Sequence, residues 1–180
     1  MSKIMSVIAS IAVLLIFLAQ TNKSEATSIK SDILATNKVL KSYNLALESL
    51  NIKDVYGLFT NDSQIYETGG NEGNFENYAK HHLEPELKNF KSLKFSKYKV
   101  ETKVDLPYAF STETYFLSLV LKNSKRVEKT INIKGLATSI LKKIDGQWKI
   151  IKYHSSGKII PNKANTKNDK RDKHNKHSGH

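Results

Sequence analysis

The first half of the chain carries apolar residues at the spacing of helices. From Ser28 to Leu50, apolar side chains recur three or four residues apart, which places them on one face of an amphipathic helix. The same spacing returns from Asn51 to Phe59, where a shorter second helix is predicted. A third helix is predicted from Phe75 to Phe90, interrupted by Pro85.

The second half carries the pattern of strands. From Phe95 to Asp105, apolar and polar residues alternate, as they do in a strand with one face on a core and the other in water. Long strands are also predicted over Tyr108–Leu121 and Arg126–Ile144, and a short strand, Ser63–Glu67, lies among the helices. Helices therefore come mainly first, and most of the sheet follows.

The last two strands form a hairpin. Asp145 and Gly146 give a strong tight-turn signal between two extended runs, because glycine adopts the positive φ that such turns need. Trp148–His154 resumes the strand pattern and begins with a large apolar anchor. This order of elements predicts an α+β fold whose helices cover one face of a curved antiparallel sheet, rather than alternating βαβ units.

Residues 1–26 have the features of a signal peptide. Lys3 is followed by the apolar run Ile4–Ala19, which is too short to span a bilayer comfortably, and Ser24–Ala26 offers small residues for cleavage after Ala26. The alternative is an uncleaved amino-terminal anchor. Either alternative places the following domain outside the cytoplasm, so the sequence predicts a periplasmic or secreted protein with no stable membrane span after cleavage.

The remaining chain divides into a domain, residues 27–157, and a polar tail, residues 158–180, which is predicted to be disordered. No cysteine is present among the 180 residues, so a packed core must stabilise the domain without disulfides. The net charge of +12 is divided between the domain and the tail. Because the lysines of the domain are scattered and form no stripe with interleaved aromatic residues, no nucleic-acid partner is predicted.

Three stretches carry a resemblance to a known family. They are LFTNDSQIYE (Leu58–Glu67), EGNFENYAKHHLEPELKNF (Glu72–Phe90) and DGQWKIIKYHSS (Asp145–Ser156). From Ile33 to Ser156 the chain resembles the nuclear transport factor 2-like superfamily, specifically its SnoaL-like bacterial branch, and within it a subgroup of exported proteins. The resemblance implies a cone, in which a bent sheet wraps around the first helix and leaves a pocket open at one end.

The resemblance also implies candidate site residues. Glu67 stands where ketosteroid-isomerase-like members place a general base, and Tyr43 where they place a phenol that stabilises an oxyanion. Burial would raise the pKa of such a carboxylate toward the range useful for proton transfer. The alternative is a core tyrosine and a solvated strand end, and no second acid beside the tyrosine can be placed. The predicted pocket lining is Tyr43, Phe59, Tyr66, Trp148 and His154.

Histidines suggest a metal site as a further alternative. His154 shares strand parity with Trp148, and one of His81 and His82 can point inward from the third helix. Glu67, His82 and His154 could therefore converge as three ligands of a divalent metal such as Zn or Cu. No spacing enforces this arrangement, and a structural role is the simpler interpretation.

The tail holds His174, His177 and His180 at every third position, which could chelate a divalent metal weakly or could simply belong to a solubilising basic tail. Motifs for phosphate-binding loops, nucleophile elbows and HExxH zinc sites are absent from the sequence.

Three functions remain open at this stage. The sequence favours an exported domain that binds a small apolar or amphipathic molecule in its pocket, with no established turnover. The alternatives are an isomerase- or hydratase-like proton-transfer enzyme that uses Glu67 and Tyr43, and an envelope metal-handling protein that uses its histidines. Dimerisation through the outer face of the sheet is common in the superfamily, so a homodimer and a monomer both remain open for this chain.

Overall fold

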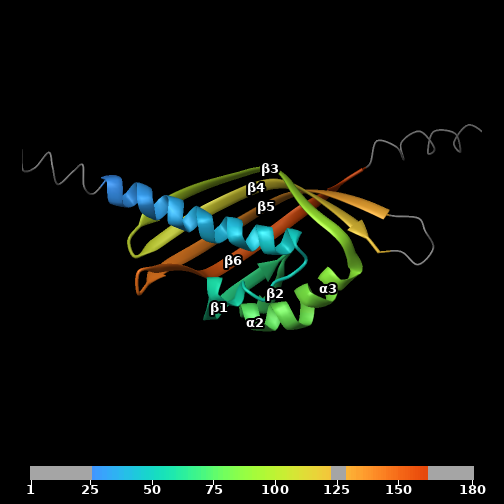
Figure 1. Ribbon diagram of the computed structural model, residues 1–180, viewed down its shortest axis with the longest axis horizontal. Helices are drawn as coiled ribbons and strands as arrows, with labels where there is room; N and C mark the ends of the chain where they lie inside the picture. Colours follow the sequence, from blue (N-terminus) through green and yellow to red (C-terminus); the bar gives the residue numbers. More distant parts are fainter. Residues whose placement is uncertain (1–25, 123–128, 162–180) are drawn as a thin grey trace, which may run out of the picture.

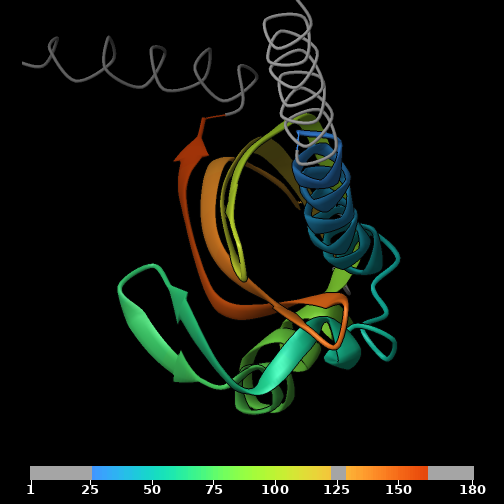
Figure 2. The same ribbon diagram turned by 90° about the vertical axis from the view of Figure 1, so that its left-hand side faces the viewer.

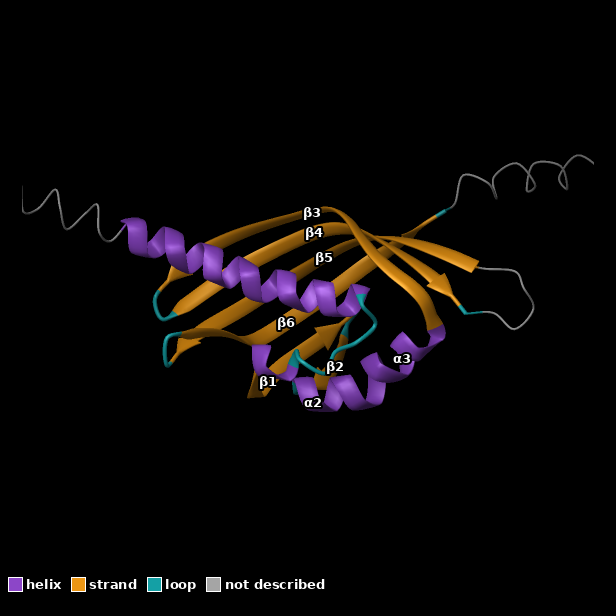
Figure 3. Ribbon diagram, viewed as in Figure 1, coloured by secondary structure: helices purple, strands orange, loops and turns teal. Residues whose placement is uncertain are grey.

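A computed structural model describes residues 26–122 and 129–161. Within them, a single six-stranded sheet, in the order β2-β1-β6-β5-β4-β3, lies beneath one long helix, residues 26–48 (Figure 1). The other helical segments lie together near one end of the sheet, as Figure 3 shows. The elements that follow the long helix are a 3-10 turn (Tyr56–Leu58), β1 (Phe59–Glu67), β2 (Gly70–Gly73), α2 (Phe75–Tyr78), a π-helical turn (Ala79–Leu83), α3 (Glu84–Asn89), β3 (Phe90–Asp105), β4 (Tyr108–Leu121), β5 (Lys129–Ile144) and β6 (Gln147–Ile160).

The α+β fold with a curved sheet is confirmed. The sheet bends around the first helix, which lies along its concave side, as the end-on view of Figure 2 shows. Hydrogen bonds attach this helix to successive strands, from Thr102 Oγ1 to Asn37 Oδ1 (2.6 Å) and from Asn44 Nδ2 to Glu113 Oε2 (3.0 Å). The end of the helix is held by Glu48, whose Oε1 accepts from the backbone N–H of Phe95 at 2.7 Å. The predicted association of sheet and helix is therefore present along most of the helix.

The sheet is mixed, whereas a purely antiparallel sheet was expected. β1 runs parallel to β6, and all other neighbouring strands are antiparallel. The reason is the connection after β1: the chain makes a hairpin into β2 and then crosses through α2 and α3 to the opposite edge, where β3 begins. β1 is therefore left to pair with the last strand.

The predicted second helix is largely wrong. Only Tyr56–Leu58 is helical, as a 3-10 turn, and Phe59 already belongs to β1, where it pairs with Ile150. The Phe59 side chain is buried, so tertiary packing outweighs a weak helical pattern. The third helix begins after Asn74, whose side chain accepts from the backbone N–H of Asn77 at 2.9 Å.

The aromatic core joins the first helix, β1 and α2. The rings of Phe59 and Phe75 stack with centroids 3.9 Å apart and planes 7° from parallel. Tyr43 meets both edge-on, at 5.3 Å from Phe59 and 6.0 Å from Phe75. All three side chains are buried, so this cluster fixes where β1 and its last residue, Glu67, lie relative to the helix.

Asp32 fixes the beginning of the helix against the last hairpin. Its Oδ1 accepts from Lys143 Nζ at 2.6 Å and from Trp148 Nε1 at 3.0 Å, and the residue is buried. The hydrogen bond from Lys143 is the main reason that the pKa of Asp32 lies below its usual value. The hydrogen bond to Asp32 thus holds the Trp148 indole near the start of the first helix.

We expect Asp32→Ala to lower the free energy of unfolding by about 1–3 kcal/mol, because it leaves the buried indole N–H without an acceptor. Urea unfolding would measure the loss. Asp32→Asn is the matched control: it keeps an acceptor for Trp148 and should cost less than the alanine variant. Equal losses for both variants would contradict this role of the indole hydrogen bond.

Several predictions fall outside the described residues. These are the signal peptide apart from Ala26, the start of the predicted strand at Arg126, and the tail from residue 162 onward, with its three histidines. The beginning of the predicted disordered tail is wrong, because residues 158–160 belong to β6 and pair with β5. Among the described helices, none combines the length and apolarity needed to cross a membrane.

Candidate functional site

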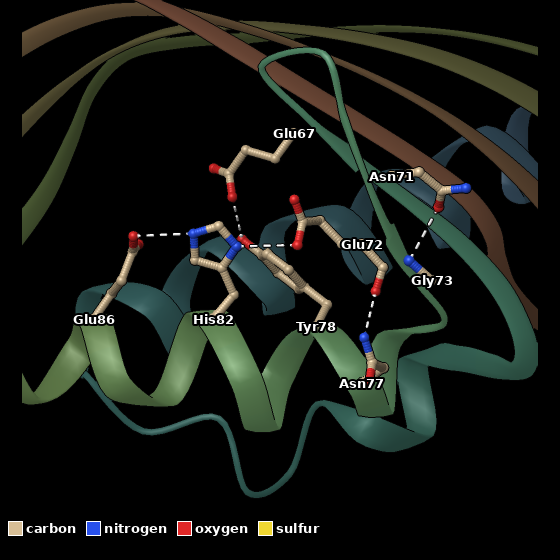
Figure 4. A network of polar contacts seen from close by, with 8 residues as sticks. All are labelled: Glu67, Asn71, Glu72, Gly73, Asn77, Tyr78, His82 and Glu86. Carbon is tan, nitrogen blue, oxygen red and sulfur yellow. Dashed lines mark hydrogen bonds and ion pairs between the residues drawn. The ribbon is translucent and has the colours of Figure 1, made fainter.

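Glu67 is the last residue of β1, and its carboxylate is partly buried on the concave side of the sheet. Tyr78 Oη, from α2, donates a hydrogen bond to Glu67 Oε2 at 3.1 Å (Figure 4). Burial is the main cause that raises the pKa of Glu67 above its usual value, and the bond from Tyr78 acts in the opposite direction. A partly buried carboxylate of this kind can exchange a proton closer to neutral pH than a solvated one.

Tyr43 forms no hydrogen bond with Glu67, although the charge of Glu67 acts on it. It is buried beneath the site, and burial, followed by the charge of Glu67, raises its pKa well above the usual value. A hydrogen bond with Tyr78 lowers the pKa of Tyr43, but less than burial raises it. Tyr78 therefore links the two residues that the family resemblance implied, Glu67 and Tyr43, and no pattern in the sequence indicated this role.

Glu113 is a second acid that the sequence analysis missed. It lies on β4, is only 1% exposed, and accepts hydrogen bonds from Tyr98 Oη (2.6 Å) and Asn44 Nδ2 (3.0 Å). Burial raises its pKa, and the two hydrogen bonds only partly offset this effect. The sequence contains a signal for it: Ala109, Ser111 and Glu113 occupy every second position of β4, so they share one face of the strand, and that face is buried.

The two acids lie at opposite ends of one row across the sheet. Glu67 pairs with Ser155, Ser155 with Ala137, and Ala137 with Glu113. Because paired residues point to the same face, all four side chains lie on the concave side, and three strand spacings separate the acids by roughly 14 Å. Only small side chains stand between them in this row.

Tyrosines border the row. Tyr115 lies two residues beyond Glu113 on β4, and burial, with the charges of Glu113 and Glu67, raises its pKa to about 12. Tyr153 is buried beside Tyr43, with ring centroids 5.5 Å apart. The concave site therefore combines two acids of raised pKa with phenols that can donate hydrogen bonds.

The placement predicted for His154 is wrong. The register between β5 and β6 shifts at one point, since Ile140 pairs with Lys152 but Leu141 pairs with Ile150. This bulge inserts one residue after Ile150 and reverses the alternation of the strand. Tyr153 therefore shares the buried face of Trp148, and His154 lies on the outer face of the sheet.

Tyr66 is on the outer face as well, where it pairs with His154. The ammonium of Lys152 lies 5.7 Å from the centre of its ring. Of the five predicted lining residues, Tyr43 is the one close to Glu67. Phe59 is part of the aromatic core, and Trp148 is held by Asp32 at the start of the helix.

The three predicted metal ligands do not come together. His82 Nδ1 lies 3.1 Å from Glu72 Oε2, and its Nε2 lies 3.3 Å from Glu86 Oε1, so carboxylates engage both ring nitrogens (Figure 4). His154 is on the opposite face of the sheet. Within residues 26–122 and 129–161, no group of three or more histidines and carboxylates is arranged to hold a metal ion.

His82 instead connects the β1–β2 hairpin to the helix that follows it. Glu72 belongs to β2 and Glu86 to α3, so the imidazole bridges the two elements next to Glu67. The hydrogen bond with Glu72 is the main cause that raises the pKa of His82. Protonation of the imidazole strengthens its contacts with both Glu72 and Glu86, because they then become ion pairs.

Glu113 should make stability depend on pH. A carboxyl group with a raised pKa binds more protons in the folded than in the unfolded state, so the free energy of unfolding falls as pH rises from the unfolded-state pKa through the folded-state pKa. Each pKa unit corresponds to about 1.4 kcal/mol. We expect Glu113→Gln to flatten this slope in urea unfolding between pH 4 and pH 8, and the exposed control Glu101→Gln to leave it unchanged. An unaltered slope in Glu113→Gln would contradict the prediction.

A sheet bent around one long helix, closed at one end by short helices and carrying acids on its concave face, defines a nuclear transport factor 2-like domain. Residues 36–161 match the family model of the SnoaL-like domain, and the chain belongs to this family. The predicted membership in the superfamily and in its SnoaL-like branch is confirmed.

Solved structures share this fold. A candidate ketosteroid isomerase from Shewanella frigidimarina NCIMB 400 is 27% identical, with a TM-score of 0.54 over 68% of this chain and 94% of the other. A candidate scytalone dehydratase from Novosphingobium aromaticivorans DSM 12444 is 18% identical, with a TM-score of 0.58 over 71% and 85%. An NTF2-like superfamily protein from Salmonella enterica serovar Typhimurium LT2 is 14% identical, with a TM-score of 0.59 over 77% and 95%. None of the curated proteins compared with the chain matches it.

Proposed function

We propose that the concave face binds a small, uncharged, partly apolar molecule and transfers a proton on it, with Glu67 as the general base. The observation that carries this proposal is the partly buried Glu67 carboxylate, whose pKa is raised and whose Oε2 is oriented by Tyr78. A base is most effective when its pKa approaches the working pH, and burial moves Glu67 in that direction. The names of the Shewanella and Novosphingobium proteins agree with this class of reaction.

The reaction begins when Glu67 removes a proton from a carbon next to a carbonyl group. The electron pair of the broken C–H bond moves toward the carbonyl oxygen, which gains negative charge and needs a hydrogen-bond donor. The protonated Glu67 then returns the proton to another carbon in an isomerisation, or to a departing hydroxyl group in a dehydration. The enzyme ends in its starting state in both cases.

Tyr115 is the best placed donor for the charged oxygen. Its phenol has no hydrogen-bond partner among the described residues, and the charges of both Glu113 and Glu67 act on it. Tyr78, by contrast, already donates to Glu67, and Tyr98 to Glu113. Tyr43 acts through Tyr78 and is therefore a positioning residue.

The charges of the site restrict its substrate. Glu67 and Glu113 would repel an anionic molecule whenever either is ionised. Tyrosine rings and the small residues between the acids provide apolar contact instead. A neutral carbonyl compound with an apolar body satisfies both conditions.

Binding without turnover is the second candidate. The position of Glu113 favours it. Its Oε2 accepts hydrogen bonds from both Tyr98 and Asn44, and its side chain is almost completely buried. This acid is therefore better placed to shape the site than to contact a substrate. Export of the protein and metal uptake by the tail histidines stay predictions of the sequence.

One experiment separates the two candidates. The full-length protein is incubated in D₂O with a panel of neutral enones and β-hydroxy ketones, thermal stabilisation reports binding, and mass spectrometry reports deuterium at the carbon next to the carbonyl. Proton transfer predicts enzyme-dependent exchange for compounds that bind. Stabilisation without exchange would favour binding alone, and neither signal across the panel would contradict both.

A further inference from the structure

The outer face of the sheet carries a groove, which Tyr115 of the concave site also helps to line but which includes neither Glu67 nor Tyr78. It has a volume of about 710 Å³ and crosses β3, β4, β5 and β6. Phe116 and Leu136 contribute apolar surface, and Leu136 is 41% exposed. A volume of this size lies in the range that small-molecule ligands occupy.

Four lysines border the groove: Lys97, Lys99, Lys134 and Lys158. All four are exposed, no acidic residue lines the groove, and none of the four forms an ion pair with a carboxylate among the described residues. The ammonium of Lys97 lies over the Phe116 ring, 4.9 Å from its centre. Positive charge and apolar surface are therefore adjacent.

Lys134 and Lys158 are directly opposite each other on β5 and β6. Like charges in directly opposed positions destabilise a sheet, so this pair opposes folding unless something neutralises it. Natural sequences accept such local conflicts mainly where function requires them. The pair therefore places two positive charges side by side within the groove.

From these observations we infer that the groove binds a phosphate-bearing amphiphile. Lys134 and Lys158 hold the phosphate group, and Lys97 and Lys99 add positive charge from β3, on the other side of β4. Two opposed ammonium groups match a dianionic phosphate monoester better than a single carboxylate, because they supply a charge of about +2 in one place. The apolar chain then lies on Phe116 and Leu136.

A second copy of the chain is a poorer occupant of the groove. Across a two-fold axis through this part of the face, the lysines of one copy would approach the lysines of the other, and like charges at an interface are unfavourable. A homodimer through the outer face would therefore have to avoid the groove or hold an anion in it.

The test uses the full chain and monododecyl phosphate below its critical micelle concentration, with binding measured by calorimetry. We expect saturable binding that weakens as NaCl rises from 50 to 500 mM, because salt screens the lysines. Lys134→Gln combined with Lys158→Gln should weaken it at least tenfold. The control, Lys38→Gln combined with Lys41→Gln, removes the same charge from exposed positions on the first helix and should change the affinity less than twofold.

Three further ligands define the chemistry. Inorganic phosphate and dodecyl maltoside should each bind at least tenfold more weakly, because one lacks the chain and the other lacks the charge. Equal affinity for inorganic phosphate would reduce the groove to a simple anion site and overturn the proposal. Binding to vesicles that contain anionic phospholipid, without binding of the monomeric amphiphile, would also overturn it in favour of a membrane surface.

Amide chemical shifts locate the ligand. We expect the amide signals that respond to monododecyl phosphate to belong to residues 114–116, 134–136 and 156–158. Changes centred on Glu67 and Tyr78 would place the ligand in the concave site and contradict the inference. Sedimentation of the lysine double variant tests the remaining occupant, since a change of oligomeric state would mean that this surface contacts a second copy.

Discussion

Replacing Glu67 with glutamine should lower kcat/KM for proton transfer by about 10²- to 10⁴-fold, the contribution typical of a positioned general base. Glutamine has nearly the same shape and still accepts the hydrogen bond from Tyr78, but it cannot take up a proton at neutral pH. The affinity for an unreactive substrate analogue should remain within about threefold of the wild type, because the concave surface keeps its form. The measurement is the rate of deuterium exchange or isomerisation for a compound that the panel identifies.

The matched control is Glu86→Gln, which also removes a carboxylate from the neighbourhood of His82 but not the proposed base. We expect its rate to stay within about fivefold of the wild type. If Glu67→Gln kept the wild-type rate, Glu67 would not be the base, and the proton-transfer function would be excluded for that reaction. Equal losses in both variants would assign the effect to the negative charge around His82 and not to a base at Glu67.

Phe75→Ala should have the largest effect on stability, a loss of about 3–5 kcal/mol. Phe75 is 2% exposed, stacks on Phe59 and meets Tyr43 edge-on, so its removal opens a cavity where the first helix, β1 and α2 meet. A typical domain is stable by about 5–15 kcal/mol, so this variant should approach the limit of folding. Urea unfolding followed by circular dichroism measures the change.

Phe110→Ala provides the comparison, because Phe110 is an aromatic residue on the outer face with 47% of its surface exposed. Its loss should cost less than about 1 kcal/mol, since little apolar surface leaves a buried environment. Similar losses in the two variants would show that burial in the aromatic cluster does not determine stability. If Phe75→Ala proves insoluble, Phe75→Leu should show a smaller loss with the same sign.

The sequence predicted the fold through its local patterns. The spacing of apolar residues between Ser28 and Leu50 indicated the long helix, and the predicted strand Tyr108–Leu121 agrees with β4 at both ends. The turn at Asp145 and Gly146 was also correct, and both residues adopt a positive φ. These features depend on neighbouring residues, whose preferences a linear pattern records directly.

The arrangement of side chains in the site followed from contacts between distant segments. Alternation along the last strand predicted that His154 would face the helix, but one inserted residue after Ile150 turned it outward. Tyr78 and Glu113 were not recognised because their roles depend on partners that lie 11 and 69 residues away, Glu67 and Asn44. A pattern read along one strand contains neither a register shift nor a partner on another element.

By itself, the sequence determined an α+β domain of the SnoaL-like family, with a long first helix and Glu67 at the end of a strand. Only the tertiary structure decided that Tyr78 joins Glu67 to Tyr43, that Glu113 is a second buried acid, and that the lysines gather on the outer face. The physical reason is that burial and cross-strand register set both the pKa of a carboxylate and the face to which a side chain points. Both properties arise when the sheet closes around the helix.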